Sequence, residues 1–368
     1  MKTGTANLPL HYGKAPRWLF ERMTRLAREI TIGVVAEFGP EDMLRRMADP
    51  FWFQALGCIL GFDWHSSGVT TTVCGALKEG IKGLEPELGL FIAGGKGRTS
   101  RQTPLEIQNA GTNLSTDTGR LVYASRMAAK VDSAAVQDGY QLYHHCFFFT
   151  ASGSWAVVQQ GMNETIRYAR RYHWLGDTVA DFVCEPHNAV CCDLRGQALN
   201  LVAADSSQAR STIATIVAQG RPEKLITDLD RLGRLELPSR HHITPQDVNP
   251  KRLRTILLRT YELQPASFEA LLGLAGVGAR TIRALSLISE LVYGVPSCYT
   301  DPARYSFAHG GKDGHPYPVD RRTYDKSIEL VGRVLRRARL SQAETEAALR
   351  RLNVVEEWAE ASGSQAAE

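Results

Sequence analysis

The chain has 368 residues, of which 43 are Lys or Arg, 39 are Asp or Glu, and 43% are hydrophobic. This length predicts two domains with an ample core, and the composition excludes disorder, collagen-like repeats and coiled coils. A formal net charge of +4 is too small to indicate a nucleic-acid partner by itself, so the position of the positive charge is more informative than its sum.

The seven cysteines are an odd number in a chain that opens without a signal peptide, so we expect a reduced, cytoplasmic setting. No C-x-x-C spacing occurs, which argues against a cysteine zinc ribbon, and most of the cysteines are interpreted as small buried hydrophobes. No apolar run reaches the roughly 18 residues that a membrane span needs, so no membrane partner is expected.

The first half of the chain mixes helix and strand patterns. Apolar residues recur at three- and four-residue steps from Trp18 to Val34 with arginines between them, which predicts an amphipathic helix. A second helix is expected over Thr72–Lys82. The aromatic run Tyr140–Thr150 and the segment after Ser152-Gly153 form a predicted hairpin of buried strands. The expected strands are Leu88–Ala93, Tyr140–Thr150, Ser154–Gln160, Thr178–Val183 and Ala198–Val202.

From about Ser206 helical segments follow one another with Pro and Gly between them. The sequence therefore predicts an α+β N-terminal domain over residues 1–205, an all-α domain over 206–358 and a flexible tail over 359–368. The expected helices of the second domain are Arg221–Leu232, Pro250–Thr260, Ser267–Leu274, Ala279–Val292, Thr323–Ala338 and Gln342–Leu352.

The sharpest motif is a Gly-Val-Gly turn between two of these helices, within Leu271–Leu285. Two glycines allow a tight turn and leave the first amides of the next helix open to a phosphate. Such a turn holds a nucleic-acid backbone without reading its sequence. The alternative is a helical pair that only packs, with glycine as a C-cap. The predicted DNA contacts are Gly276, Val277, Gly278, Arg280, Thr281 and Arg283.

This region resembles the helix-hairpin-helix DNA glycosylase superfamily over roughly Arg221–Leu352, because the turn is followed by the Gly- and Pro-containing loop Tyr293–Asp301. The resemblance implies that Asp301 supports cleavage of the glycosidic bond. Arg280 stands where bifunctional members keep a Schiff-base lysine, so a lyase is not expected. The chain departs from the pattern at Pro302 and has no C-terminal four-cysteine loop.

The chain as a whole resembles the family labelled domain of unknown function seven-six-three, a label that implies no activity. Five short motifs carry this resemblance. They are Gly-Phe-Asp-Trp-His-Ser-Ser-Gly, Gly-Gly-Lys-Gly-Arg, Tyr-His-His, Val-Val-Gln-Gln-Gly-Met-Asn and Arg-Arg-Tyr-His-Trp.

Polar residues in the first half could form a phosphodiester-cleaving site. Asp63, His65 and His144 supply oxygen and imidazole ligands for a divalent ion, Mg²⁺ or Mn²⁺. Lys96 or Arg98 would neutralise the scissile phosphate. His144 and His145 point to opposite faces if their segment is a strand, so only one of them joins the ion. Buried, hydrogen-bonded histidines are the alternative interpretation.

Two further segments are candidate DNA contacts. In Gly94-Gly95-Lys96-Gly97-Arg98 the glycines leave backbone amides accessible, and Lys96, Arg98 and Arg101 add positive charge that suits a nucleic-acid backbone. The segment lacks the P-loop spacing, so no nucleotide cofactor is expected. A solvated basic turn is the alternative. Arg170 and Arg171 alternate with aromatic residues in Tyr168–Trp174, a composition suited to stacking on single-stranded bases.

Three hypotheses follow for a protein with single- or double-stranded DNA as its partner. The first is a metal-dependent nuclease that grips DNA through the Gly-Val-Gly turn. The second is a monofunctional DNA glycosylase that uses Asp301 on a flipped nucleotide. The third is a DNA-binding protein without catalysis, whose binding depends on salt.

Overall fold

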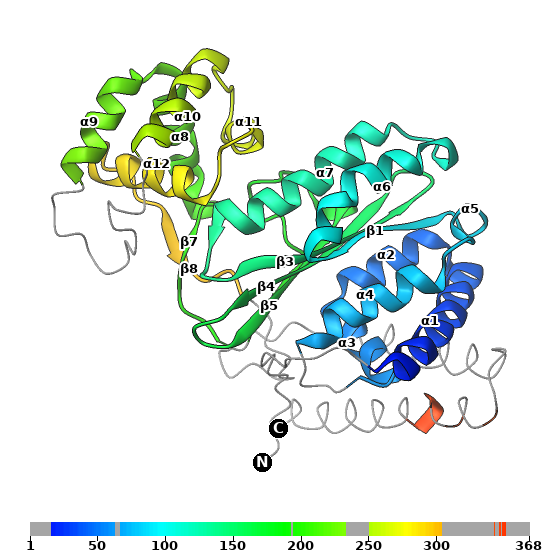
Figure 1. Cartoon of the computed structure of the whole chain (residues 1–368). Helices are drawn as coiled ribbons and strands as arrows, with labels where there is room; N and C mark the ends of the chain where they lie inside the picture. Colours follow the sequence, from blue (N-terminus) through cyan, green and yellow to red (C-terminus); the bar gives the residue numbers. More distant parts are fainter. Residues whose placement is uncertain are drawn as a thin grey trace.

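A five-stranded antiparallel sheet forms the centre of the molecule, with helices on both of its faces (Figure 1). The computed structural model describes residues 16–62, 67–192, 194–232 and 250–303, and beyond these Gln342, Glu346 and 348–350. The strand order is β1-β3-β4-β5-β6. These strands are β1 (Leu90–Lys96), β3 (Gln141–Thr150), β4 (Trp155–Asn163), β5 (Tyr168–Leu175) and β6 (Ala189–Cys191).

The predicted hairpin is confirmed, because β3 and β4 pair antiparallel and Gly153 turns between them with a φ of 95°. Successive residues of β3 face opposite sides of the sheet. Phe147 and Phe149 therefore pack in one core cluster and Phe148 in the other. A strand buried on both faces reads as one continuous apolar run, as this one does.

Four helices cover one face of the sheet. The predicted helix over Trp18–Val34 is the inner part of α1, and Pro50 begins α3 with Asp49 as its N-cap, whose carboxylate accepts from the amides of Phe51 and Trp52. Pro at the first helical position and Asp at the N-cap are both typical helix starts. The four helices are α1 (Arg17–Phe38), α2 (Pro40–Ala48), α3 (Pro50–Ile59) and α4 (Gly68–Gly80).

Shorter elements and one longer helix, α7, cover the opposite face. The short helix α5 (Glu85–Leu88) precedes β1, and 3-10 turns η1 (Gly97–Gln102) and η2 (Gly111–Asn113) flank α6. Within the described residues the helices over this face are α6 (Thr103–Asn109), α7 (Thr118–Lys130) and the π-helical turn η3 (Val131–Ala135).

The C-terminal helices pack into the same hydrophobic core as the face of the sheet that α7 covers. Phe268 and Ile282 belong to the same buried cluster as Phe147 and Trp174 of the sheet. The expected boundary between residues 205 and 206 therefore runs through a shared core. These helices are α8 (Ser207–Gln219), α9 (Pro222–Leu232), α10 (Pro250–Leu263), α11 (Phe268–Gly273) and α12 (Ala279–Leu291).

A second, three-stranded sheet also joins the two halves of the chain, in the order β2-β7-β8. It consists of β2 (Val136–Gln137), β7 (Gln197–Asn200) and β8 (Cys298–Thr300). The C-terminal part is therefore not all helical, because β8 is a strand. Local apolar alternation is too short in a three-residue strand to be recognised from sequence.

Three other expectations differ from the structure or lie outside the described residues. Thr178–Val183 is not a strand, because its first residue ends the 3-10 turn η4 (Gly176–Thr178) and none of its other residues is in a strand. The turn η5 (Ala204–Ser206) leads into α8. The expected helix Thr323–Ala338 and the tail over 359–368 lie outside the described residues. Among the described helices, none has the length and apolar character needed to cross a membrane.

His173 in β5 makes the stability of the fold depend on pH. Its Nε2 accepts from Arg171 Nε at 2.9 Å, so its Nδ1 carries the proton and donates to Met47 O at 2.8 Å. Burial and the Arg171 charge lower the pKa of His173 well below its usual value. The folded protein therefore keeps His173 neutral, while the unfolded chain binds a proton there below about pH 6.5.

We expect this histidine to reduce the free energy of unfolding by about 1.4 kcal/mol for each pH unit below 6.5. The unfolded state then holds the extra proton, so stability falls as the pH falls. Urea unfolding from pH 7.5 to 5 measures the slope. In His173→Gln, which keeps an acceptor and a donor but does not titrate, the slope is expected to be smaller by that amount. An unchanged slope would refute the assignment.

Candidate metal centre and nucleic-acid interface

A buried cluster of sulfur and nitrogen atoms lies between α4 and the sheet. Cys74 comes from α4, and His144 and Cys146 lie two residues apart on β3 and so face the same side. Their potential ligand atoms all lie within 4.8 Å of one another. None of the three residues is more than 2% exposed. The cluster could hold a metal ion.

His144 is the unusual member of this cluster. Both of its ring nitrogens are buried and neither has a hydrogen-bond partner in the structure. Burial, with His145 and Lys96 nearby, lowers the pKa of His144 to about 3, so the ring is neutral. An unsatisfied buried polar group costs about 1–3 kcal/mol, and a neutral imidazole with a free lone pair is the form that binds a metal.

Of the three predicted metal ligands, His144 is a member of this cluster, in which the other two potential ligands are thiols. The predicted ligands Asp63 and His65 lie outside the described residues. Thiol ligands do not suit the predicted Mg²⁺ or Mn²⁺, which prefer oxygen. The one local signal was the spacing of His144 and Cys146 on a predicted strand, since Cys74 lies far upstream.

His145 points to the opposite face, as the strand pattern predicted. Its Nδ1 donates to Gln159 Oε1 and its Nε2 accepts from Ser125 Oγ, both at 2.8 Å. Gln159 in turn donates to Asp132 Oδ2 at 2.5 Å, and Trp174 Nε1 donates to the same oxygen at 3.0 Å. His145 is 7% exposed, so it belongs to an internal polar network and not to the predicted catalytic site.

The glycine-rich segment begins in the last residues of β1, and the backbone groups of its first glycine are bound by protein side chains instead of being open to a phosphate. The Gly94 amide donates to Glu106 Oε2 at 2.6 Å and the Gly94 carbonyl accepts from Lys78 Nζ at 2.9 Å. The side chains of Lys96, Arg98 and Arg101 are exposed. Lys96 lies opposite His144 in the register of β1 and β3. Two of the predicted catalytic residues are thus neighbours.

Arg170 and Arg171 are not available to DNA, which corrects the prediction of a surface patch. Both are in β5 and are no more than 1% exposed. Arg170 forms ion pairs with Asp138 at 2.9 Å and Asp301 at 2.8 Å. Arg171 donates from both Nη atoms to Gln54 Oε1 at 3.1 Å. The strand is buried on both faces, so successive arginines enter opposite layers.

Asp301 is held inside this arrangement. Its Oδ1 accepts from Arg170 Nη1 and from the Ala303 amide, and its Oδ2 accepts from Arg170 Nη2 and from the Gly196 amide, all at 2.8–2.9 Å. The side chain is 7% exposed. Both carboxylate oxygens are thus engaged in hydrogen bonds within the protein, and the role that the glycosylase resemblance implied stays a prediction.

The predicted helix–turn–helix pair is formed by α11 and α12. Gly276 is exposed with a φ of 92°, and Arg280 is exposed at the start of α12. Gly278 is the N-cap of α12, and no side chain caps its amides. The other three predicted contacts point inward, because Val277, Thr281 and Arg283 are at most 8% exposed.

Contacts from the N-terminal half fix the inner side of this turn. Lys130 at the end of α7 donates to the carbonyls of Leu274 and Val277. Gln137 in β2 donates to Ala279 O at 2.8 Å and accepts from Arg283 Nε at 2.8 Å. Carbonyl groups of the turn therefore face the protein, which leaves the opposite side of the turn to solvent.

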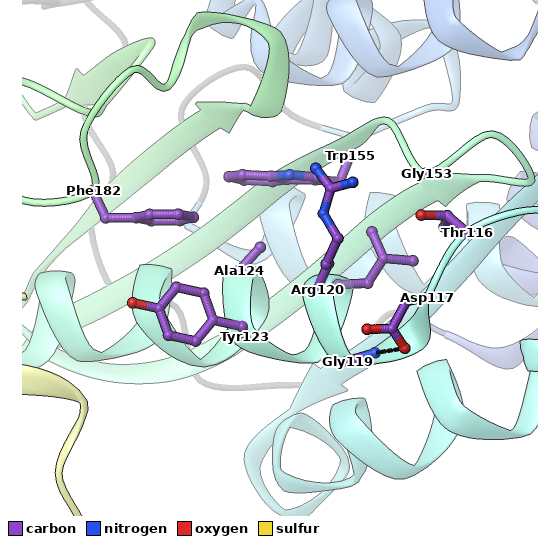
Figure 2. A pocket seen from close by; sticks show the side chains of 10 residues that line it. Thr116, Asp117, Gly119, Arg120, Tyr123, Ala124, Gly153, Trp155 and Phe182 are labelled. Atoms are coloured by element: carbon purple, nitrogen blue, oxygen red, sulfur yellow. Dashed lines mark hydrogen bonds between the residues drawn. The ribbon is translucent and has the colours of Figure 1, made fainter. Parts of the chain in front are cut away.

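Sequence reasoning missed an aromatic hollow near the start of α7, with a volume of about 360 Å³. Figure 2 shows Trp155, Phe182, Tyr123 and Arg120 around it. The rings of Trp155 and Phe182 are parallel to within 3°. Tyr123 also donates to Glu269 of α11, so the hollow and the α11–α12 turn share α7 as a support.

These features define a mixed α/β protein with antiparallel sheets, a buried thiol–imidazole cluster and an exposed glycine turn. The chain belongs to the family described as protein of unknown function (DUF763), whose model matches residues 4–319. Comparison with curated proteins and with solved structures found no match for this chain.

Proposed function

We propose that this protein binds DNA through the α11–α12 turn. The proposal depends on one observation: one side of the turn is bound to the protein and the other side is exposed. Its carbonyls are bound inside by Lys130, while Gly276, Gly278 and Arg280 lie outside at a helix N-terminus without a side-chain cap. Uncapped amides and a cation at a helix start favour an anionic ligand such as a phosphate.

Two further features of the described residues support a nucleic acid over a small anion. Exposed Lys96, Arg98 and Arg101 supply additional charge, as a polyanion requires. The hollow lined by Trp155, Phe182 and Arg120 offers aromatic surface beside α7, and bases stack on such surfaces.

Gly278→Asn tests the proposal sharply. A Cβ atom at position 278 meets nothing within 4 Å, and the φ of −150° suits any residue. Asparagine is a strong N-cap and would satisfy the α12 amides itself, so stability should stay equal or rise by a few tenths of a kcal/mol. Affinity for DNA should fall about tenfold, because the phosphate loses those charge-assisted hydrogen bonds.

Fluorescence anisotropy with short labelled single- and double-stranded DNA at low salt measures this effect, and thermal unfolding checks stability. Arg280→Gln should weaken binding and reduce the salt slope by about one counterion. Arg17→Gln is the charge-matched control, because Arg17 is 94% exposed on α1. Equal binding by the wild type and Gly278→Asn, or no binding by the wild type, would refute the proposal.

Metal-dependent strand cleavage is the second candidate function. The position of exposed Lys96 opposite His144 favours it, and Asp63 and His65 stay its proposed oxygen and imidazole ligands. Incubation of labelled DNA with Mg²⁺, Mn²⁺ or EDTA, followed by a denaturing gel, tests it. Metal-dependent breaks that Asp63→Asn and His65→Ala abolish would support a nuclease, and intact DNA under all conditions would leave DNA binding without cleavage.

A further inference from the structure

We propose that Cys74, His144 and Cys146 bind a thiolate-preferring divalent ion of the zinc class, and that this ion cross-links α4 to the sheet. The inference does not rest on DNA binding. Cysteine thiolates and imidazole are the ligands that Zn²⁺ prefers, in tetrahedral geometry. The three side chains fill three of the four positions.

The unpartnered His144 ring is the first reason for this assignment. Buried histidines elsewhere in the described fold have their ring nitrogens satisfied: His145 by Gln159 and Ser125, and His173 by Met47 and Arg171. In His144 both nitrogens lack a partner, yet two sulfur atoms lie within 4.8 Å of its possible ligand atom. A metal bond satisfies a nitrogen that the protein itself leaves unsatisfied.

Charge is the second reason. A divalent ion with two thiolates is neutral overall, so it can be buried without the cost of an isolated charge. Binding releases the two thiol protons to solvent.

Burial indicates what the ion does. The cluster is at most 2% exposed, so a bound ion is closed off from substrates and acts as a structural link. Cys74 belongs to the helical layer and the other two ligands to β3. A metal ion that joins two elements in this way contributes directly to the free energy of folding.

The test uses the full chain, stripped of metal with EDTA under reducing conditions and then titrated with Zn²⁺ or Co²⁺. We expect about one ion per chain, and with Co²⁺ a thiolate charge-transfer band and tetrahedral visible bands. Zinc should raise the melting temperature by about 10 °C. This comparison needs no variant, so a misfolded variant cannot confuse it.

Variants then assign the ligands. Cys74→Ser, His144→Ala and Cys146→Ser should each lose the Co²⁺ bands, whereas Cys192→Ser should keep them, because Cys192 is equally buried but outside the cluster. Three results would overturn the proposal: no metal uptake by the wild type, full uptake by all three ligand variants, or a Cys74–Cys146 disulfide, seen as a mass lower by two hydrogens.

Discussion

Asp138→Asn is expected to lower the free energy of unfolding by about 3–5 kcal/mol. Arg170 is buried and pairs with Asp138 and with Asp301, and both carboxylates are nearly inaccessible. Removing the Asp138 charge leaves the buried Arg170 guanidinium with one carboxylate instead of two. This loss costs more free energy than the complete set of ion pairs contributes to stability. Urea unfolding at neutral pH measures the loss.

Arg17→Gln is the control for this experiment, because it removes an ion pair with Glu21 whose side chains are 94% and 61% exposed. Exposed pairs of this kind contribute little. Asp301→Asn should behave like Asp138→Asn. If Asp301→Asn instead abolished base release while stability stayed normal, Asp301 would be a catalytic residue, and the structural account of it would be wrong.

Gly94→Ala is expected to destabilise the protein by about 3 kcal/mol or more, from overpacking and backbone strain together. A Cβ atom there would lie 2.3 Å from the His145 carbonyl and 2.6 Å from Thr103 Oγ1, and φ is 89°. The glycine therefore allows β3 and α6 to approach β1 closely, which is a packing role and not a phosphate-binding one.

Gly97→Ala separates the two causes. Gly97 also has a positive φ, of 61°, but a Cβ atom there meets nothing within 4 Å. Only the conformational penalty of about 1–2 kcal/mol applies. Equal losses in the two variants would show that close packing at Gly94 is unimportant. If either variant lost DNA affinity while its stability stayed unchanged, the interpretation of this segment as a phosphate-binding loop would be restored.

Local sequence predicts the elements in which the apolar pattern of the residues matches the faces that the folded protein buries. The hairpin of β3 and β4 has a continuous apolar run on each side of a Ser-Gly turn, and both strands are buried. The helices α1, α9 and α12 follow their apolar periodicity and their Pro or Gly starts. Short β8 has no such signal, because pairing with β7 alone defines it.

The errors arose where distant residues decide the environment. Arg170 and Arg171 lie among aromatic residues, which is also the composition of a nucleic-acid surface. Their partners Asp301 and Gln54 are 131 and 117 residues away in the chain, so no local pattern could indicate burial. For the same reason the sequence placed His144 but not Cys74 among the candidate ligands. It also predicted the glycine turn but not which side of the turn the protein covers.

The separation of Arg170 and Asp301 also affects how the protein is made. At elongation rates of about 5–20 residues per second, the 131 residues between them require roughly 7–26 seconds of synthesis. During that time Asp138 is already synthesised and can pair with Arg170, but Asp301 is not. The edge of β7 that later pairs with β8 also has no strand beside it. An open strand edge can pair with another chain. The nascent protein is therefore prone to aggregate through this edge in that interval, and β8 removes the open edge when it pairs with β7.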